Sequence, residues 1–409
     1  MDAVTSSRKY HIIIFGASGF TGNFVAEEVA RYAADTTGDE RLKWAVAGRS
    51  RARLEVTLKH VADKLATPQL ITDVDIITAD VSDKQSLAAM CGQGLLVVNC
   101  VGPYRFYGEP VVAACVENGA HYIDICGEPQ FLERMQLLYH TKALDRGVYV
   151  IGSCGFDSIP ADLGIIYTQK HFKGTLTAVE SFLTISSGPQ GTCGHDATWR
   201  SAVHGFADSG SLRQLRRSFG YKPLPVVGTK VFPRGNVFFS KEIMQYSIPF
   251  MGSDPSVVKR TQRFLFEEEH RSPIQYFAYV GVGGLLSVVK LVCGGLLFWI
   301  LVKFRLGRKL LTSIEDTCFS ITFFAEGYSE GTDPSQGPPN AKICTQVLGA
   351  EPGYVATAIA VVQAAVTLLR ERHSLPRRGG VYTPGGAFYK TALIRRLGDH
   401  SFKFSVAKD

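Results

Sequence analysis

The chain has 409 residues, of which 45% are hydrophobic and 20% are charged, and its formal net charge is +7. Its length exceeds one ordinary hydrophobic core, and its composition excludes a disordered chain. Its nine cysteines form no C-x-x-C pair, which argues against a disulfide framework and a zinc site, so we expect no metal. The mild basicity favours a protein that binds an anionic cofactor over one that binds nucleic acid, because no zinc-finger or RNA-binding motif accompanies it.

The N-terminal part of the chain alternates short apolar runs with helical patterns. The first run, Tyr10–Phe15, leads directly into glycines, which indicates a strand and not a secretory signal peptide. Runs of similar length recur at 43–47, 74–79, 95–101, 121–125 and 147–151. Strands and helices in this order predict an α/β fold, with a Rossmann-type doubly wound parallel sheet over residues 8–157.

The pattern changes after residue 157. Three segments alternate like strands of a sheet with one exposed face, and they are 176–186, 317–324 and 341–348. These segments predict a second, α+β substrate domain made of residues 158–275 and 311–352. The strongly apolar run 356–369 predicts a buried helix, and we expect the C-terminal helix and tail over 353–409 to pack back on the core.

One segment is apolar enough for a membrane. Residues 278–302 contain a single charge, Lys290, in 25 residues, which is long enough to span a bilayer. A full span and a buried hairpin are the alternatives to a membrane hairpin. A charge at mid-depth costs about 2.5–3.5 kcal/mol, and a span would separate its two flanks, so we expect 276–304 to be a membrane-associating insertion with both flanks in the cytosol. The basic residues after it suit anionic lipid headgroups, and they are Lys303, Arg305, Arg308 and Lys309.

A glycine loop lies between the first predicted strand and a predicted helix. Gly16, Gly19 and Gly22 have the spacing G-x-x-G-x-x-G. Small residues here let the backbone approach a pyrophosphate, while the helix N-terminus and its dipole face the anion. Ser18 and Thr21 can add hydroxyl donors. The loop therefore predicts a dinucleotide site, with a purely structural glycine turn as the alternative.

The end of the second predicted strand indicates which dinucleotide is bound. NAD sites usually have an acidic residue here for the ribose 2′-hydroxyl, whereas this chain has Arg49 and Ser50. A guanidinium and a hydroxyl suit a 2′-phosphate, so we expect NADP(H) as the cofactor. Asp80 is expected near the adenine, and 99–104 near the nicotinamide ribose. The predicted contacts are Gly16, Ser18, Gly19, Phe20, Thr21, Gly22, Arg49, Ser50, Asp80, Asn99, Val101, Gly102 and Tyr104.

Catalytic residues are marked less clearly than cofactor contacts. No Tyr-x-x-x-Lys dyad occurs in the sequence, which argues against the common short-chain dehydrogenase mechanism. Tyr104, after the fourth predicted strand, and His195, in the second domain, are the predicted proton donors. Further candidates, for which loop hydrogen bonding, capping or ion pairing is the alternative role, are Tyr107, Asp124, Glu128, Asp157 and Asp196.

Several stretches together resemble the saccharopine dehydrogenase-like family. They include FGASGFTG, WAVAGRS, NCVGPYRFYGEPVV, IDICGEPQF and GFDSIPADLG, and they extend over most of the chain. The resemblance implies a Rossmann domain with an α+β domain, reductase-type ancestry and association with membranes or lipid droplets. Related bacterial proteins are trans-acting enoyl reductases, which implies a lipid-like substrate and a place in lipid metabolism.

These observations lead to two functional hypotheses of different classes. The first is an NADP(H)-dependent oxidoreductase that acts on a hydrophobic or lipid-like substrate at a membrane or lipid-droplet surface. The second is a non-catalytic, NADP(H)-binding protein anchored to a lipid surface. An amino-acid dehydrogenase comes third, because we can assign no arginine-rich motif to the carboxylates of such a substrate. A homo-oligomer is left open.

Overall fold

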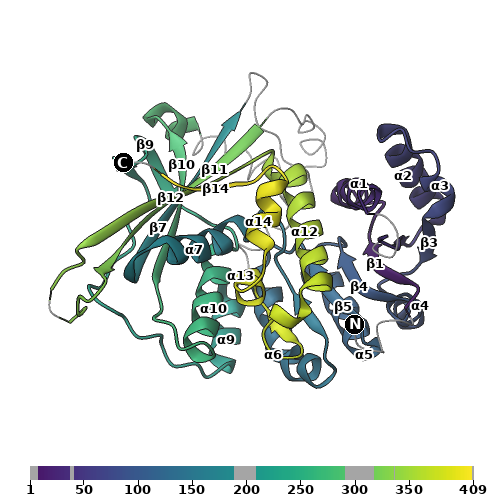
Figure 1. Cartoon of the computed structure of the whole chain (residues 1–409), viewed down its shortest axis with the longest axis horizontal. Helices are drawn as coiled ribbons and strands as arrows, with labels where there is room; N and C mark the ends of the chain where they lie inside the picture. Colours follow the sequence, from purple (N-terminus) through teal and green to yellow (C-terminus); the bar gives the residue numbers. More distant parts are fainter. Residues whose placement is uncertain (1–7, 37–40, 188–208, 291–316, 336, 408–409) are drawn as a thin grey trace.

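The computed structural model describes residues 8–36, 41–187, 209–290, 317–335 and 337–407. Two seven-stranded sheets stand side by side with helices between and around them (Figure 1). The first sheet has the order β13-β6-β5-β4-β1-β2-β3, and every neighbouring pair is parallel. Its strands are β1 (Tyr10–Phe15), β2 (Trp44–Gly48), β3 (Asp75–Thr78), β4 (Gly94–Asn99), β5 (His121–Asp124), β6 (Tyr149–Ile151) and β13 (Gly380–Tyr382).

Both faces of the first sheet are covered, so its strands read as continuous apolar runs. Ile12 and Ile14 of β1 enter one core, while Ile13 and Phe15 enter the other. The first core contains helices α1 (Phe20–Ala34), α2 (Arg51–Lys64) and α12 (Thr357–Arg370). The second contains α4 (Lys84–Cys91), α5 (Tyr104–Asn118) and α6 (Pro129–Asp145). The predicted parallel Rossmann-type sheet is confirmed.

The second sheet is mixed. Its order is β14-β12-β11-β7-β10-β9-β8, in which β10 and β7 are parallel and the other neighbours antiparallel. Helices α7 (Ile159–His171) and α10 (Asp254–Glu267) lie on the face toward the first sheet (Figure 1). The strands are β7 (Gly174–Ser187), β8 (Phe238–Ser240), β9 (Gln245–Pro249), β10 (Gln275–Gly283), β11 (Thr317–Ser329), β12 (Ala341–Gly349) and β14 (Lys403–Val406).

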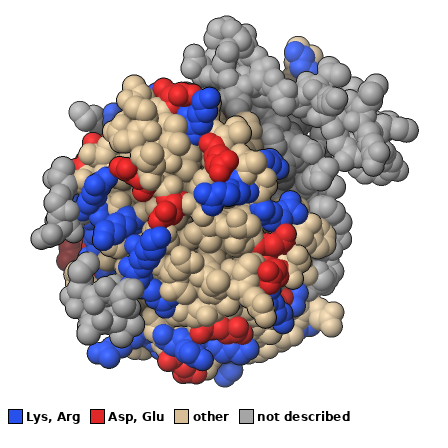
Figure 2. Space-filling model, turned by 90° about the vertical axis from the view of Figure 1, so that its right-hand side faces the viewer, with Lys and Arg blue, Asp and Glu red and all other residues tan. Residues whose placement is uncertain are grey.

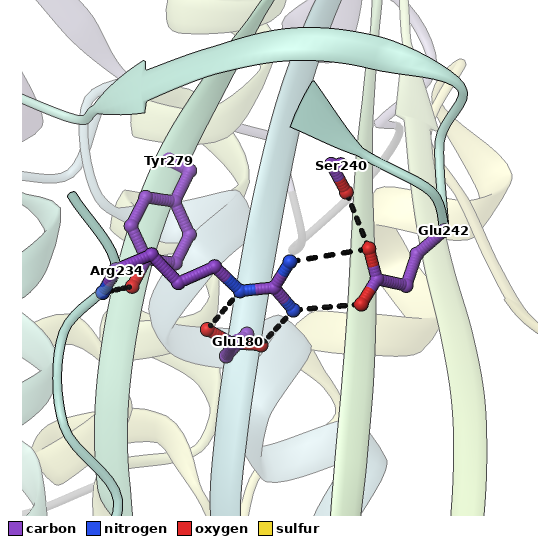
Figure 3. Close-up of polar contacts among 5 residues, drawn as sticks. All are labelled: Glu180, Arg234, Ser240, Glu242 and Tyr279. Atoms are coloured by element: carbon purple, nitrogen blue, oxygen red, sulfur yellow. Dashed lines mark hydrogen bonds and ion pairs between the residues drawn. The ribbon is translucent and has the colours of Figure 1, made fainter. Parts of the chain in front are cut away.

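The other face of the second sheet carries a polar network around Arg234 (Figure 3). The guanidinium donates to both carboxylate oxygens of Glu180 on β7, at 2.9 and 2.5 Å, and to Glu242 at 2.7 and 3.2 Å. The Arg234 amide donates to the hydroxyl of Tyr279 on β10 at 2.9 Å, and Ser240 donates to Glu242 at 2.6 Å. The network ties the loop that carries Arg234 to three strands.

The C-terminal part of the chain returns to the first sheet. Helix α12 packs beside α1 and against β4 and β5, and β13 extends the sheet in parallel to β6. The predicted buried helix at 356–369 is therefore confirmed. In the part of the chain that the structure describes, Pro352–Arg370 is the one helix long and apolar enough to cross a membrane, and 78% of its most apolar window is buried. It is a core helix.

The predicted apolar insertion at 276–304 begins differently in the structure. Residues up to Gly283 belong to β10, which pairs with β7 on one side and β9 on the other. Tyr276 and Tyr279, which point to opposite faces of β10, are each less than 4% exposed. A strand buried on both faces reads as an uninterrupted apolar run, which explains why the insertion was predicted to begin within β10. A helix begins at Leu285 and is described as far as Lys290, and residues 291–304 lie outside the described ranges.

Candidate dinucleotide-binding cleft

The glycine loop joins β1 to α1 with its backbone tightly folded on itself. Gly16 has a φ of +88°, a region that favours glycine, and the Gly19 amide donates to its carbonyl at 2.9 Å. A Cβ added to Gly22 would lie 2.2 Å from the Gly16 oxygen, so no side chain fits there. The first turn of α1 thus presents backbone amides that have no partner within the helix, and these suit a pyrophosphate. The residues fit the predicted cofactor.

Two arginines lie beside this loop, at the end of β2. Arg49 is exposed and makes no ion pair within the described ranges, and Arg53 donates to the Ser18 carbonyl at 3.3 Å. The Ser50 hydroxyl caps α2 by accepting from the Arg53 amide at 3.4 Å. Arg51 instead pairs with Glu55 on the outer side of α2. Arg53 was not predicted, because it lies in the first turn of α2, beyond the strand end that the sequence pattern marks.

Asp80 lies close to Arg49 at the end of β3. One of its carboxylate oxygens accepts from the Ser82 amide at 2.9 Å and the Ser82 hydroxyl at 2.7 Å. These hydrogen bonds hold the pKa of Asp80 below its usual value, and the charge of Arg49 lowers it further. The predicted place of Asp80 near the adenine end is consistent with the fold. However, this carboxylate oxygen already accepts the hydrogen bonds that stabilise the turn at Ser82.

The side chains predicted at the nicotinamide end point into the protein. Asn99 is fully buried, where it donates to the Tyr122 hydroxyl at 3.1 Å and accepts from the Val101 amide at 3.0 Å. Tyr104 is 6% exposed, and its hydroxyl donates to the Asn99 carbonyl at 2.8 Å. Burial raises the pKa of Tyr104 well above its ordinary value. Both side chains are therefore held by partners within the protein.

Tyr354, an aromatic residue from the C-terminal part of the chain, packs beside the glycine loop. Tyr354 packs edge-on against Phe20 at 4.6 Å between ring centroids and stacks on Phe24 at 5.6 Å. Glu351 holds the turn before it by accepting from the amides of Gly353 and Tyr354. Phe20 was predicted as a cofactor contact; Tyr354 was not, because its partners lie more than 300 residues earlier in the chain.

Two carboxylates after β5 hold the neighbouring loops. Asp124 is fully buried and accepts from the Tyr122 hydroxyl and from the amides of Cys126 and Ser153, at 2.8, 2.9 and 2.9 Å. Burial raises its pKa to about 6 despite these donors. Glu128 accepts from the Tyr104 amide at 3.0 Å at the start of α5. Both carboxylates therefore fix loop geometry.

Some predicted or alternative sites lie elsewhere. His195 and Asp196 lie outside the described residues. A groove of about 740 Å³ lined by Arg41, Trp44 and Asp75 lies at the edge where β1 to β3 begin, so it is opposite the glycine loop. On the face that holds the outer end of the first sheet, Lys and Arg are interspersed with Asp and Glu (Figure 2). That distribution suits a small anionic ligand better than a nucleic acid.

The first sheet and its glycine loop form an NADP-binding domain, since residues 12–151 match the family model described as the saccharopine dehydrogenase NADP binding domain. A saccharopine dehydrogenase-like oxidoreductase of Mus musculus is 55% identical, over 98% of this chain and 98% of that protein. The chain therefore belongs to the saccharopine dehydrogenase-like oxidoreductases.

More distant relatives share nearly the whole length. A lipid droplet localized protein of Caenorhabditis elegans is 33% identical, over 98% of this chain and 99% of that protein. A protein of Mycobacterium tuberculosis named for trans-acting enoyl reduction is 28% identical, over 95% of this chain and 96% of its own. The solved apo saccharopine dehydrogenase of Saccharomyces cerevisiae has a TM-score of 0.56 at 12% identity, covering 98% of this chain and 100% of that one, and so supports the two-domain fold alone.

Proposed function

We propose that this oxidoreductase uses NADPH to reduce a hydrophobic, lipid-like substrate at a membrane or lipid-droplet surface. The observation that carries the proposal is the pair Arg49 and Arg53 beside the glycine loop, where a dinucleotide's 2′-phosphate would lie. The cofactor would supply a hydride, and the backbone of the glycine loop, with the two guanidinium groups, would hold its anionic groups.

Exposed apolar side chains support a lipid surface. Leu285, Leu286 and Val289 are 59%, 68% and 50% exposed where the apolar segment leaves β10. Met244, in the turn before β9, is 71% exposed. Tyr246, two residues after Met244, pairs with Gly283 at the end of β10. These side chains therefore lie at the same end of the sheet. Such a patch suits insertion into an acyl layer. The name of the Caenorhabditis elegans relative favours the same surface.

In the central experiment, the full-length protein is bound to vesicles that contain anionic phospholipid. It is then given NADPH and each of a panel of long-chain enoyl and carbonyl compounds. We expect oxidation of NADPH that is coupled to a reduced lipid product, with NADH as the matched control. Saccharopine in the same panel tests the amino-acid dehydrogenase. Tight binding of NADPH without oxidation on any compound would replace the proposal with the non-catalytic, lipid-anchored alternative.

A second experiment tests the surface itself. Leu285→Glu with Leu286→Glu should reduce flotation of the protein with these vesicles, because charged side chains resist insertion. Val406→Glu is the matched control, since Val406 is 43% exposed on the far edge strand β14. Equal flotation of the double variant and the control would place the lipid contact elsewhere.

A further inference from the structure

The carboxyl group of Asp157 lies on the loop between β6 and α7, and it takes part in none of the contacts described above. The Ser158 amide donates to the Phe156 carbonyl at 2.7 Å, which puts Asp157 at the tip of a three-residue turn. Ser158 has a φ of +135°, which is unfavourable for a residue with a side chain. It is fully buried and bonds the Ser253 hydroxyl at 3.0 Å. The surrounding packing thus fixes where Asp157 projects.

The Asp157 carboxylate lies where the two domains meet. A Cβ added to Gly127, after β5, would be 3.0 Å from one carboxylate oxygen, and a Cβ added to Gly252, after β9, would be 3.6 Å from the other. Glycine at both positions leaves room for the carboxylate between the two loops. The side chain is only partly buried, and no residue within the described ranges donates a hydrogen bond to it. By contrast, Asp124 accepts three hydrogen bonds on the neighbouring strand.

A second carboxyl group, Asp254, begins α10 beside this loop, where the preceding Ser253 hydroxyl donates to the Asp157 carbonyl at 3.2 Å. Asp254 is 5% exposed, and one of its oxygens has no hydrogen-bond partner in the described structure. Burial raises the pKa of Asp157 to about 6, and burial with the charges of Asp157 and Asp162 raises that of Asp254 well above its ordinary value. Asp162, one turn along α7, accepts from Thr261 and the Gly385 amide. The charge of ionised Asp157 therefore favours the protonated form of Asp254.

We propose that Asp157 is the proton donor of the reductase. The inference rests on the proposed function. The reacting double bond gains a hydride on one atom from the nicotinamide cofactor, which is oxidised by two electrons. Its other atom gains the Asp157 proton, and water then reprotonates the carboxylate. Tyr104 is unsuited to this role because its hydroxyl is bound to the Asn99 carbonyl.

The first test needs no substrate and no cofactor. A carboxyl whose pKa is raised on folding destabilises the folded protein above pH 6 and not below about pH 4, where both states are protonated. Asp157→Asn should therefore raise the melting temperature relative to wild type at pH 8, and this gain should vanish toward pH 4. The exposed Asp63→Asn on α2 is the control. A gain that is the same at both pH values would overturn the proposal.

The second test uses turnover of NADPH with the compound that the vesicle panel identifies. Asp157→Asn should bind NADPH as wild type does and lose about 100-fold or more in kcat. Asp254→Asn should leave the pH above which kcat falls near its wild-type value, because burial, and not the charge of Asp254, raises the pKa of Asp157. Asp162→Asn on α7, whose carboxylate accepts from the Thr261 hydroxyl, is the matched control for burial.

The outcomes separate the two proposals. If the wild type is active and Asp157→Asn is inactive with unchanged NADPH affinity, the result supports Asp157 as the proton donor. If wild type and Asp157→Asn both turn over at similar rates, the donor assignment fails while the reductase stands. If wild type oxidises NADPH with no compound, the reductase and the donor fail together.

Discussion

The two seven-stranded sheets of this molecule are covered in different ways. The first is parallel and has helices on both faces, so we expect its ligand contacts to come from loops at the edge where the strands end. The second has helices on one face and holds a loop to its other face through Arg234. Changes at the first edge should therefore alter cofactor binding, whereas changes on the second sheet's outer face should alter stability alone.

The largest effect is expected at Gly22. Gly22→Ala places a methyl group 2.2 Å from the Gly16 carbonyl oxygen, so the loop must move. NADPH affinity should fall by about 100-fold, equivalent to about 3 kcal/mol, in a fluorescence titration. Gly398→Ala in helix α14 (Leu393–Asp399), where no atom lies within 4 Å of the added Cβ, should leave affinity unchanged. Equal affinities for the two variants would contradict the role of the loop.

Arg234→Ala tests the opposite side of the comparison. Glu180 would lose its partner while only 18% exposed, so the free energy of unfolding should fall by about 2 kcal/mol with NADPH affinity unchanged. Arg51→Ala, which breaks an exposed pair, should cost less than about 0.5 kcal/mol. Arg234 also lowers the pKa of Glu242 from 4.5 to about 2, so this stabilisation is present above pH 4.5 and is lost as the pH falls toward 2. Urea unfolding measures both effects.

Arg49→Ala tests which dinucleotide the first edge prefers. Loss of a charge-assisted contact to the 2′-phosphate should weaken NADPH binding by about 30-fold, or about 2 kcal/mol, and leave NADH binding unchanged. Arg51→Ala on the next residue but one should leave NADPH binding as in wild type, because Arg51 pairs with Glu55. Competition between the two nucleotides measures the preference, and a parallel loss of NADH affinity would argue against a 2′-phosphate contact.

The smallest effect concerns acid stability of the first sheet. His121 on β5 is 6% exposed, its ring accepts from the Tyr149 amide, and burial lowers its pKa to about 3. Because the unfolded histidine binds a proton near pH 6.5, its stabilising contribution falls as the pH drops below that value. Between pH 8 and pH 5.5, the free energy of unfolding of His121→Gln should fall by about 1 kcal/mol less than that of the wild type. An unchanged pH profile would show that the charged histidine is tolerated.

Local patterns were sufficient for much of the fold. Strand β1 was predicted with its observed bounds, and helix α12 to within one residue at each end, because each has a strong period or a long apolar run. Strand β13 was missed because three residues between glycines and a proline carry no period. Its place is set by pairing with β6, which lies far earlier in the chain.

The candidate site shows the same division. The glycine loop is a contiguous motif, so the sequence predicted it. The directions of side chains depend on distant partners, so the sequence did not show that the Tyr104 hydroxyl donates to the Asn99 carbonyl. The contact between Ser158 and Ser253, which brings Asp254 close to Asp157, joins residues 95 positions apart and is encoded by no local pattern.

The position of β13 has a consequence for the order in which the protein is made. During translation the residues up to 151 leave the ribosome first, but the outer strand of their sheet and the helix that covers one face arrive only with residues 357–382. A nascent chain therefore carries an open sheet edge and an uncovered apolar face until synthesis is nearly complete. A chain that stops before residue 380 lacks the last strand of its nucleotide-binding sheet, however complete its glycine loop.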